Sequence, residues 1–224
     1  MNDPLDNPVW SSLTGPHAGI AVGTCAARHY PRDMAPFSAI AEASPAAYAD
    51  LARDLPTGLE ARLFRPKEEA PPAGWRMISA RPILQMVAGA PPAPDEGPAP
   101  ERLDGRDIDA MMALAAAAKP GPFDRRTPAL GRYLGLRENG RLVAMAGERF
   151  RLAGYTEISA ICTHPEARGR GHAARLTRAL MRGIADRGEI SFLHVFPDNP
   201  AVSLYERLGF KRRATLWVLW HGLA

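Results

Sequence analysis

Residues suited to binding an anion lie together in the segment Cys162–Ala173, which reads CTHPEARGRGHA. Gly169 and Gly171 allow the backbone to turn tightly and to approach a ligand without a Cβ in the way. A helix is expected to follow, so the unpaired N–H groups of its first turn and the positive end of its dipole point into this turn. Such a site suits a pyrophosphate, and Arg168 and Arg170 add positive charge beside it.

Two familiar phosphate-binding patterns do not describe this turn. No Gly-Lys-Ser or Gly-Lys-Thr follows it, which excludes the phosphate loop of nucleoside triphosphatases. The dinucleotide fingerprint needs three spaced glycines and a later acid, and it does not match either. Taken alone, the glycine turn is equally consistent with a plain strand-to-helix connection, so its interpretation depends on a second motif.

The second motif is the segment Asn199–Phe210, which reads NPAVSLYERLGF. Together the two segments resemble the GNAT superfamily of N-acetyltransferases. The first is similar to the family's acyl-CoA motif, an Arg or Gln, two residues, Gly, one residue, then Gly or Ala; the second is similar to its closing motif, Leu-Tyr-Glu-x-Leu-Gly-Phe. The resemblance covers roughly residues 101–211, and Phe192–Val195 is similar to the branch that includes glycine N-acyltransferases.

The resemblance implies transfer of an acetyl or other acyl group from acetyl-CoA (coenzyme A) to a primary amine, by direct attack in a ternary complex. The acceptor is expected to be a small molecule, an amino acid or a peptide. The pantetheine would enter a gap between two splayed strands, at residues 157–163 and 191–196. The expected cofactor-binding residues are Ile161, Cys162, Thr163, Arg168, Gly169, Arg170, Gly171, His172, Ala173 and Asn199.

One of these residues departs from the family's pattern. The family's Asn lies seven residues before the Tyr, whereas Asn199 lies six before Tyr205 and Asp198 occupies the usual position. Either the turn is one residue shorter or the pantetheine contact differs. A non-catalytic acyl-CoA sensor or interaction module with the same fold is the alternative function.

Two residues are expected to be catalytic, Glu157 and Tyr205. A lysine amine with a pKa of about 10.4 is only about 0.04% neutral at pH 7, so a general base is useful. The resemblance implies that Glu157 is this general base, and Glu148 is the alternative base. The competing interpretation of Glu157 is a strand residue held in a salt bridge. Tyr205 occupies the family's phenol position beside the departing thiolate, and a core aromatic is its alternative. Cys162 lacks a positioned histidine, which favours a small buried thiol over a nucleophile.

The elements expected around these motifs form an α/β fold, a GNAT-type mixed sheet flanked by helices, over residues 101–224. Asn139-Gly140 is a strong hairpin signal, and the proline–glycine turn at residues 120–122 is expected to end a helix and to lie above the acceptor site. In order, the expected elements are a helix from Asp104 or Gly105 to Lys119, strands Tyr133–Arg137, Arg141–Arg149 and Tyr155–Thr163, a helix Gly171–Arg187, a strand Ser191–Phe196, a helix Pro200–Leu208 and a strand Ala214–His221.

A smaller α/β region is expected to precede this domain at residues 1–90, followed by a Pro-rich linker at 91–100. Its role is either a degenerate half of the same fold or a cap that shapes the acceptor pocket. Pro82 restricts the last strand to a sheet edge or a break. The expected elements are strands Ile20–Tyr30 and Phe37–Ala41, a helix Pro45–Leu55 capped by Ser44, and strands Leu59–Arg65 and Trp75–Val87.

Composition limits the remaining function classes. The formal charge is +4, but acids and bases are interspersed, which argues against a nucleic-acid-binding face. No apolar run approaches the roughly 20 residues of a membrane helix, and Met1–Trp10 lacks the features of a secretory signal, so a cytoplasmic protein without membrane partners is expected. Two distant cysteines and six scattered histidines predict no metal site. A monomer or a homodimer is expected.

Overall fold

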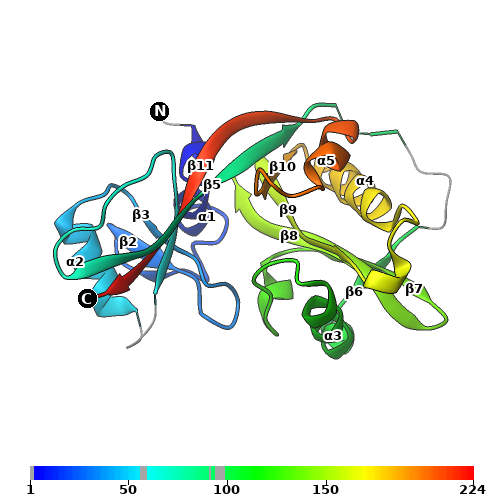
Figure 1. Cartoon of the computed structure of the whole chain (residues 1–224), viewed down its shortest axis with the longest axis horizontal. Helices are drawn as coiled ribbons and strands as arrows, with labels where there is room; N and C mark the ends of the chain where they lie inside the picture. Colours follow the sequence, from blue (N-terminus) through cyan, green and yellow to red (C-terminus); the bar gives the residue numbers. More distant parts are fainter. Residues whose placement is uncertain (1–2, 56–59, 91, 94–98) are drawn as a thin grey trace.

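The main structural unit is an eight-stranded mixed sheet with the strand order β4-β11-β5-β10-β9-β8-β7-β6 (Figure 1). The computed structural model describes residues 3–55, 60–90, 92–93 and 99–224. Strands β9 and β10 pair in parallel, and the other neighbours pair antiparallel. The strands are β4 (Ala61–Arg65), β5 (Trp75–Ala88), β6 (Glu101–Leu103), β7 (Tyr133–Glu138), β8 (Arg141–Leu152), β9 (Tyr155–Thr163), β10 (Ile190–Val195) and β11 (Phe210–Leu223).

Helices cover both faces of the sheet around β8 and β9, as predicted for this fold class. On one face, α4 (His172–Ala185) buries Leu176, Leu180 and Ile184 together with residues of α5 (Val202–Arg207). These three positions recur at helical spacing, which is why the sequence predicts this helix well. On the other face, α3 (Ile108–Ala118) packs Met111 and Leu114 against β7, β8 and β9. No helix in the described ranges is long and apolar enough to span a membrane.

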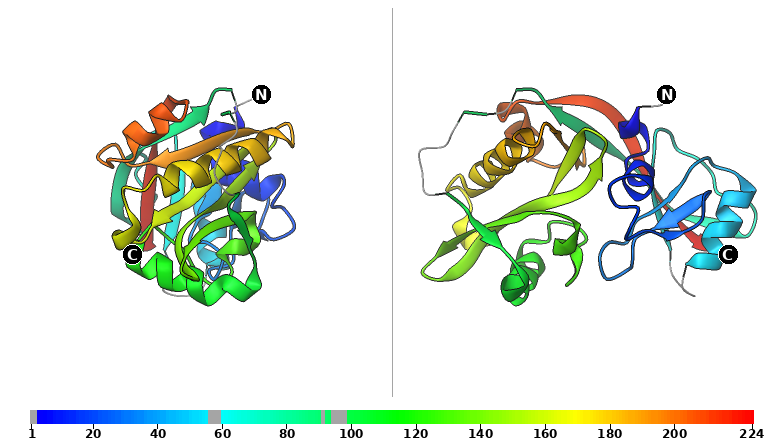
Figure 2. Two further views of the ribbon diagram at one scale, coloured as in Figure 1. Left: turned by 90° about the vertical axis from the view of Figure 1, so that its right-hand side faces the viewer. Right: turned by 180° about the vertical axis from the view of Figure 1, so that it is seen from behind.

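The N-terminal residues form a lobe at one end of the long strands β5 and β11, each 14 residues long (Figures 1 and 2). This lobe contains a small antiparallel sheet of β1 (Val22–Gly23), β2 (Ala27–His29) and β3 (Ser38–Ile40), with α1 (Pro8–Thr14) and α2 (Pro45–Asp54). Strands β4 and β5 precede the expected linker in sequence, yet they hydrogen-bond within the main sheet. Residues 91 and 94–98 of that linker lie outside the described residues.

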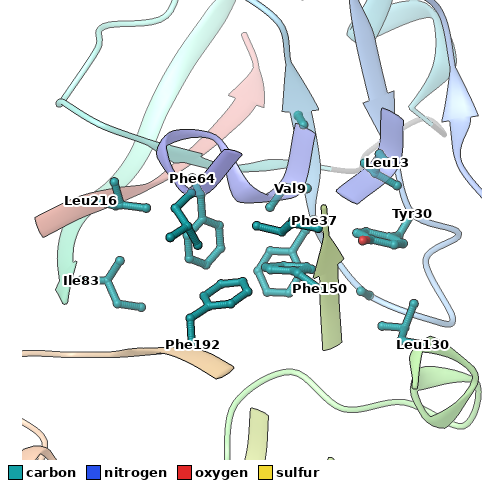
Figure 3. Close-up of a cluster of buried hydrophobic side chains, with 14 of the residues drawn as sticks. Val9, Leu13, Tyr30, Phe37, Phe64, Ile83, Leu130, Phe150, Phe192 and Leu216 are labelled. Carbon is teal, nitrogen blue, oxygen red and sulfur yellow. The ribbon is translucent and has the colours of Figure 1, made fainter. Parts of the chain in front are cut away.

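Aromatic side chains from both halves of the chain share one core (Figure 3). Phe37 and Phe64 come from the N-terminal part and meet at a ring-centroid distance of 5.5 Å. Both contact Phe150 of β8, at 5.3 and 5.8 Å. Full burial of such a side chain stabilises a fold by about 1.5–3 kcal/mol. This core therefore couples the N-terminal lobe to the sheet that carries the glycine turn.

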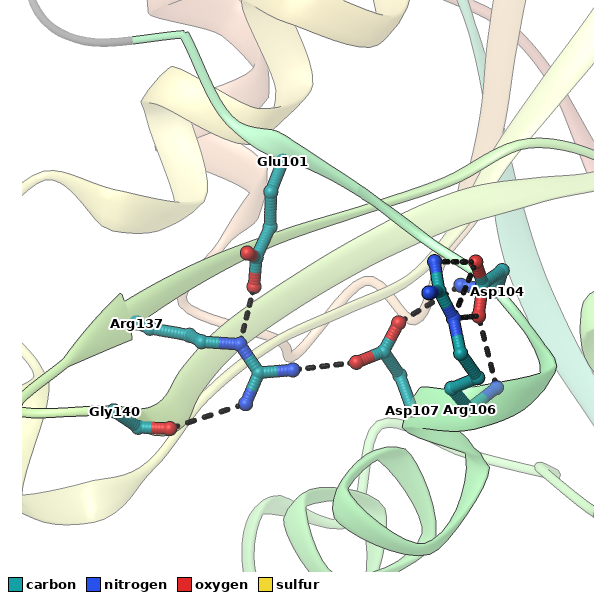
Figure 4. Close-up of polar contacts among 6 residues, drawn as sticks. All are labelled: Glu101, Asp104, Arg106, Asp107, Arg137 and Gly140. Carbon is teal, nitrogen blue, oxygen red and sulfur yellow. Dashed lines mark hydrogen bonds and ion pairs between the residues drawn. The ribbon is translucent and has the colours of Figure 1, made fainter.

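The C-terminal hairpin forms as predicted, with positive φ at Asn139 (50°) and Gly140 (80°). Arg137 links this hairpin to its neighbours, as Figure 4 shows. Its guanidinium donates to Glu101 in β6, to Asp107 ahead of α3 and to the carbonyl of Gly140. The same close-up shows Asp104 capping the short 3-10 helix at residues 105–107. These contacts attach α3 and the edge strand to the sheet.

Several element predictions need correction. The single strand predicted at Ile20–Tyr30 is two short strands, because Thr24 Oγ1 accepts hydrogen bonds from the N–H groups of Ala26 and Ala27 and turns the chain. Strand β5 is interior rather than at an edge. Pro82 is tolerated there because β10 pairs only with Leu84–Val87, which leaves Pro82 with one neighbouring strand, β11. The helix α1 and the strand β6 were not predicted.

Candidate active site

The gap expected between two strands opens between β9 and β10. Their parallel pairing ends at Phe192 and Glu157, and beyond this point the two strands no longer pair. A cavity of about 840 Å³ occupies the opening and is lined by Ile158–Thr163 and by residues 193–196. Backbone groups of β9 that would pair with a neighbouring strand are therefore directed at the cavity.

A β-bulge at Ala160 adds to this arrangement. Met145 faces Cys162 and Gly147 faces Ser159, so β9 has one more residue than β8 over this stretch. Ala160 has a φ of 52°, which is uncommon for a residue with a Cβ. Bulges redirect backbone groups beside binding sites. No glycine marks this one, so the sequence carried no signal for it.

The predicted phosphate turn has the expected backbone. Gly169 and Gly171 have φ values of 79° and 77°, and a Cβ built on either would meet no atom within 4 Å. In the described part of the chain, the N–H groups of Gly169, Arg170 and Gly171 make no hydrogen bond. Gly169 and Gly171 line a hollow of about 220 Å³ that shares Thr163, Arg168, Ala173 and Leu204 with the larger cavity. The two hollows adjoin at these four residues, and together they are called the groove, which lies between the start of α4 and the strand gap.

The two arginines of the turn differ in their surroundings. Arg168 lines both hollows, and its Nε lies 3.4 Å from the carbonyl oxygen of Thr163. Arg170 instead pairs with Glu138 at 2.6 Å, and His172 Nε2 lies 3.0 Å from the same carboxylate. The side chains of Arg170 and His172 are thus held by Glu138.

Further predicted cofactor residues, Ile161, Cys162, Thr163 and Asn199, all line the larger cavity. Burial raises the pKa of the Cys162 thiol to about 12, so it stays protonated and is a poor nucleophile. Asn199 Oδ1 accepts a hydrogen bond from the N–H of Ala201 at 2.9 Å, at the start of α5. Its amide nitrogen is the group left for a ligand.

Tyr205 lies on α5 and faces the same cavity. Its hydroxyl makes no hydrogen bond with any described residue, while its ring packs against Phe210. Burial raises the pKa of the phenol to about 12, so the hydroxyl is protonated at neutral pH. Tyr205 can therefore donate a hydrogen bond or a proton into the cavity.

Glu157 is completely buried and has a different environment. Arg149 binds both of its carboxylate oxygens at 2.7 Å, and His194 Nδ1 lies 2.7 Å from Oε1. Burial alone would raise the pKa of this carboxyl, but the Arg149 charge and the hydrogen bonds hold it at about 2. Arg149 and His194 line the cavity, whereas Glu157 does not. The salt bridge that the competing interpretation of Glu157 expected is present, and a catalytic role for this residue stays a prediction.

The alternative base, Glu148, is also held by an arginine. Its Oε1 accepts from Arg187 Nη2 at 3.0 Å, and its Oε2 accepts from the N–H of Arg132 at 3.3 Å. Glu148 does not line the cavity either, and none of the described cavity-lining residues is an Asp or a Glu. Across the described ranges, no three His, Cys, Asp or Glu side chains group as metal ligands would.

Arg149, His194 and Gln85 were not predicted. Gln85 Nε2 lies 3.1 Å from His194 Nε2 and donates to the carbonyl of Leu5, while Arg213 donates to Gln85 Oε1. Since Gln85 supplies a proton to Nε2, His194 carries its own proton on Nδ1 and donates it to Glu157. A hydrogen-bonded chain thus joins the N-terminal segment to the point where β9 and β10 part.

The variant Glu157→Gln is expected to lower the free energy of unfolding at pH 7 by about 3–5 kcal/mol, because Arg149 would remain buried without a counter-charge. The folded-state pKa of about 2 lies below the ordinary 4.5, so this stabilisation is present above pH 4.5 and lost as the pH falls toward 2. Denaturant unfolding at pH 7 and pH 3 should show the difference between the two proteins shrinking in acid.

A matched control is Glu206→Gln, which removes the exposed pair with Arg212. Such a pair contributes at most about 1 kcal/mol. Equal losses in the two variants, or a Glu157→Gln deficit that does not change between pH 7 and pH 3, would contradict this account of the buried pair.

Comparisons with known proteins match both halves of the chain. The family described as FR47-like protein matches residues 133–218. A crystal structure from Novosphingobium aromaticivorans, assigned as an acetyltransferase of the GNAT family, is 41% identical, covers 100% of both chains and has a TM-score of 0.92. No match is found among curated proteins.

Two more distant structures share the fold. A GCN5-related N-acetyltransferase from Kribbella flavida is 22% identical, with 95% of this chain and 93% of that chain covered and a TM-score of 0.66. A conserved protein of unknown function from Staphylococcus epidermidis is 10% identical, with 91% and 93% covered and a TM-score of 0.58. In all three structures the match extends over the N-terminal lobe as well as the sheet around β9.

Proposed function

Because this chain belongs to the GNAT family of acetyltransferases, we propose that it transfers an acetyl group from acetyl-CoA to a primary amine within a ternary complex. The observation that carries the proposal is the groove of two adjoining hollows, one at the glycine turn and one at the gap between β9 and β10. At the glycine turn the groove offers N–H groups that make no hydrogen bond within the described part of the chain. At the strand gap it offers backbone groups of β9 that no longer pair with β10.

The groove offers groups that suit successive parts of the cofactor. Unpaired N–H groups at residues 169–171 and the first turn of α4 suit a pyrophosphate, with Arg168 beside it. The backbone of Ile161–Thr163 and the amide of Asn199 would hold the pantetheine. When bound, acetyl-CoA supplies an activated acyl group to the acceptor amine.

Tyr205 holds a proton on its phenol oxygen at the wall of this groove. The raised pKa of about 12 keeps that proton in place at neutral pH, and the hydroxyl has no competing partner among the described residues. We assign it the role of donor to the departing thiolate. A positioned acid contributes roughly 10²–10⁴-fold to such reactions.

The proton of the attacking amine needs a different acceptor from the two glutamates. Glu157 and Glu148 are each paired with an arginine and do not line the cavity. We propose that water takes this proton, and that Glu157 acts as a positioning residue for Arg149 and His194 at the strand gap. An α-amine with a pKa of about 8 is already nearly 10% neutral at pH 7.

The first 90 residues suit the role of a cap over the acceptor site. Phe37, Arg62, Phe64 and Arg81 lie in the first 90 residues, and all four line the cavity. The turn at residues 120–122 lines it as well, where it was expected above the acceptor. Assignment to the glycine N-acyltransferase branch, a cytoplasmic location and a monomer or homodimer stay predictions of the sequence.

A non-catalytic acyl-CoA sensor is the second candidate. The observation that favours it is the lack of an Asp or Glu among the described residues of the cavity wall. The intact Tyr205 at the cavity wall favours the enzyme.

Thermal unfolding with and without acetyl-CoA tests cofactor binding. At about 100 times the dissociation constant, a ligand that binds only the folded state adds about 2.7 kcal/mol, which is a rise of several degrees in Tm for a chain of this size. CoA should give a similar rise, whereas ATP and NAD should not. An unchanged Tm at millimolar acetyl-CoA, or equal rises with all four nucleotides, would contradict the assigned groove.

A further inference from the structure

One wall of the cavity is a face of the main sheet, where a basic, an aromatic and a hydroxyl side chain lie in one row across three strands. The strand register places Arg62 of β4 opposite Trp220 of β11, and Trp220 opposite Ser79 of β5. All three residues line the cavity. Because side chains on one face of a sheet recur at every second residue, this row is fixed by the pairing of the three strands.

Arg62 carries a charge that the described residues do not pair. Its guanidinium carbon lies 4.0 Å from the centre of the Trp220 ring, and its Nε is buried without a hydrogen-bond partner. Arg62 forms no ion pair in the described ranges. The acid that acts on its charge is Glu60, whose carboxylate accepts a hydrogen bond from Trp220 Nε1. Its attraction for the Arg62 charge is smaller than the repulsion that Arg32 exerts on the same charge. Burial and Arg32 together lower the pKa of Arg62, as expected for a cation that lacks a counter-ion.

The next row adds a second arginine. Phe64, Val218 and Arg81 lie side by side across the same strands and also line the cavity. Arg81 stacks on Phe196 at 4.0 Å and reaches Asp198 only at 3.9 Å, with both side chains largely exposed. Since no acid is found among the described cavity-lining residues, this wall has an excess of positive charge.

The Arg62 row lies a short distance from the strand gap. The ring of Phe64, in the adjacent row, is 4.7 Å from the ring of His194, which follows the last β9–β10 pair closely. Successive rows on one face are two residues apart, or roughly 7 Å. The apolar side chains of Phe64 and Val218 occupy the intervening row. A small molecule can thus reach from Arg62 to the gap across an apolar surface.

We propose that the acceptor is a small amine that also carries an oxyanion, a carboxylate or a phosphate, and that Arg62 binds this group with a contribution from Arg81. The inference rests on the proposed acetyl transfer. It assigns a recognition role to the part of the main sheet formed by β4, β5 and β11: the oxyanion binds there, and the amine points toward the gap between β9 and β10. The paired Arg149 is excluded from this role because Glu157 already neutralises it.

Matched pairs of amines test the proposal. For each amine, kcat/KM for acetylation is measured from the rate at which the free thiol of CoA is released. The pairs are 4-(aminomethyl)benzoate with its amide, β-alanine with β-alaninamide, and O-phosphoethanolamine with ethanolamine. A charge-assisted contact predicts that the anionic member of at least one pair reacts about 10- to 150-fold better than its neutral partner. If one of the two carboxylate pairs gives the largest ratio, the oxyanion is a carboxylate; if the phosphate pair gives it, the oxyanion is a phosphate.

Arg62→Gln should bring this ratio close to one while the acetyl-CoA-induced rise in Tm is retained, which shows that the variant is folded and binds the cofactor. Arg62→Lys should keep part of the preference. The control Arg53→Gln removes a charge from the exposed end of α2 and should leave the ratio unchanged.

Three outcomes would overturn the inference. If acetylation is observed but the ratio is near one in every pair, the oxyanion proposal is contradicted and the proposed acetyl transfer is not. A wild-type ratio that persists in the Arg62→Gln/Arg81→Gln double variant would exclude these arginines as the binding group. Acetyl-CoA binding without acetylation of any amine would contradict the proposed function and the inference with it.

Discussion

Gly171→Val is expected to weaken acetyl-CoA binding strongly while the chain still folds. Gly171 has a φ of 77°, where a β-branched residue is strongly disfavoured, so valine would force the turn into another conformation. The N–H groups of residues 169–171 would then no longer converge on one anion. Loss of two charge-assisted hydrogen bonds, each contributing about 1.5–3 kcal/mol, weakens binding by roughly 10²–10⁴-fold. Calorimetric titration with acetyl-CoA measures the loss.

Gly154→Val provides a closely matched control. Gly154 has a φ of 78°, and a Cβ there would also meet no atom within 4 Å, but it lies in the turn between β8 and β9 and does not line the groove. Backbone strain should therefore be similar in the two variants, and only Gly171→Val should lose the cofactor. Near-normal binding by Gly171→Val would mean that the phosphate turn is wrongly assigned.

Tyr205→Phe is expected to reduce kcat by about 10²–10³-fold and to change acetyl-CoA affinity little. The substitution removes one oxygen that faces the cavity and leaves the ring in contact with Phe210. Since burial raises the pKa of this phenol to about 12, its proton is present throughout the neutral range. Ionisation of Tyr205 should thus lower kcat only as the pH rises toward 12.

Tyr155→Phe is the corresponding control, because Tyr155 begins β9 and does not line the cavity. Its kcat should equal that of the wild type. If Tyr205→Phe also retains full kcat, the departing thiolate does not depend on this hydroxyl, and the assigned role fails.

Local sequence signals predicted much of the C-terminal part. The Asn139-Gly140 turn, the strand Tyr155–Thr163 and the apolar face of α4 each depend on residues close together in the chain, and the structure has all three. The glycine turn belongs to the same class, since its conformation follows from residue types at fixed spacing. Such features need no knowledge of distant partners.

Long-range contacts account for what the sequence did not reveal. The buried state of Glu157 depends on Arg149 from β8 and His194 from β10, and neither pairing has a local signature. The interior place of β5 depends on pairing with β10 and β11, which lie more than 100 residues further along the chain. Arg62 joins the cavity only because β4 pairs with the last strand.

The most direct test of acetyl transfer is mass spectrometry of the small molecules formed when the protein is incubated with acetyl-CoA and a pool of primary amines. The proposed function predicts equal amounts of free CoA and N-acetylated amine, with no product when the amines are omitted. Acetyl-CoA that binds the protein but remains intact in the presence of every amine would contradict the enzyme and support the sensor.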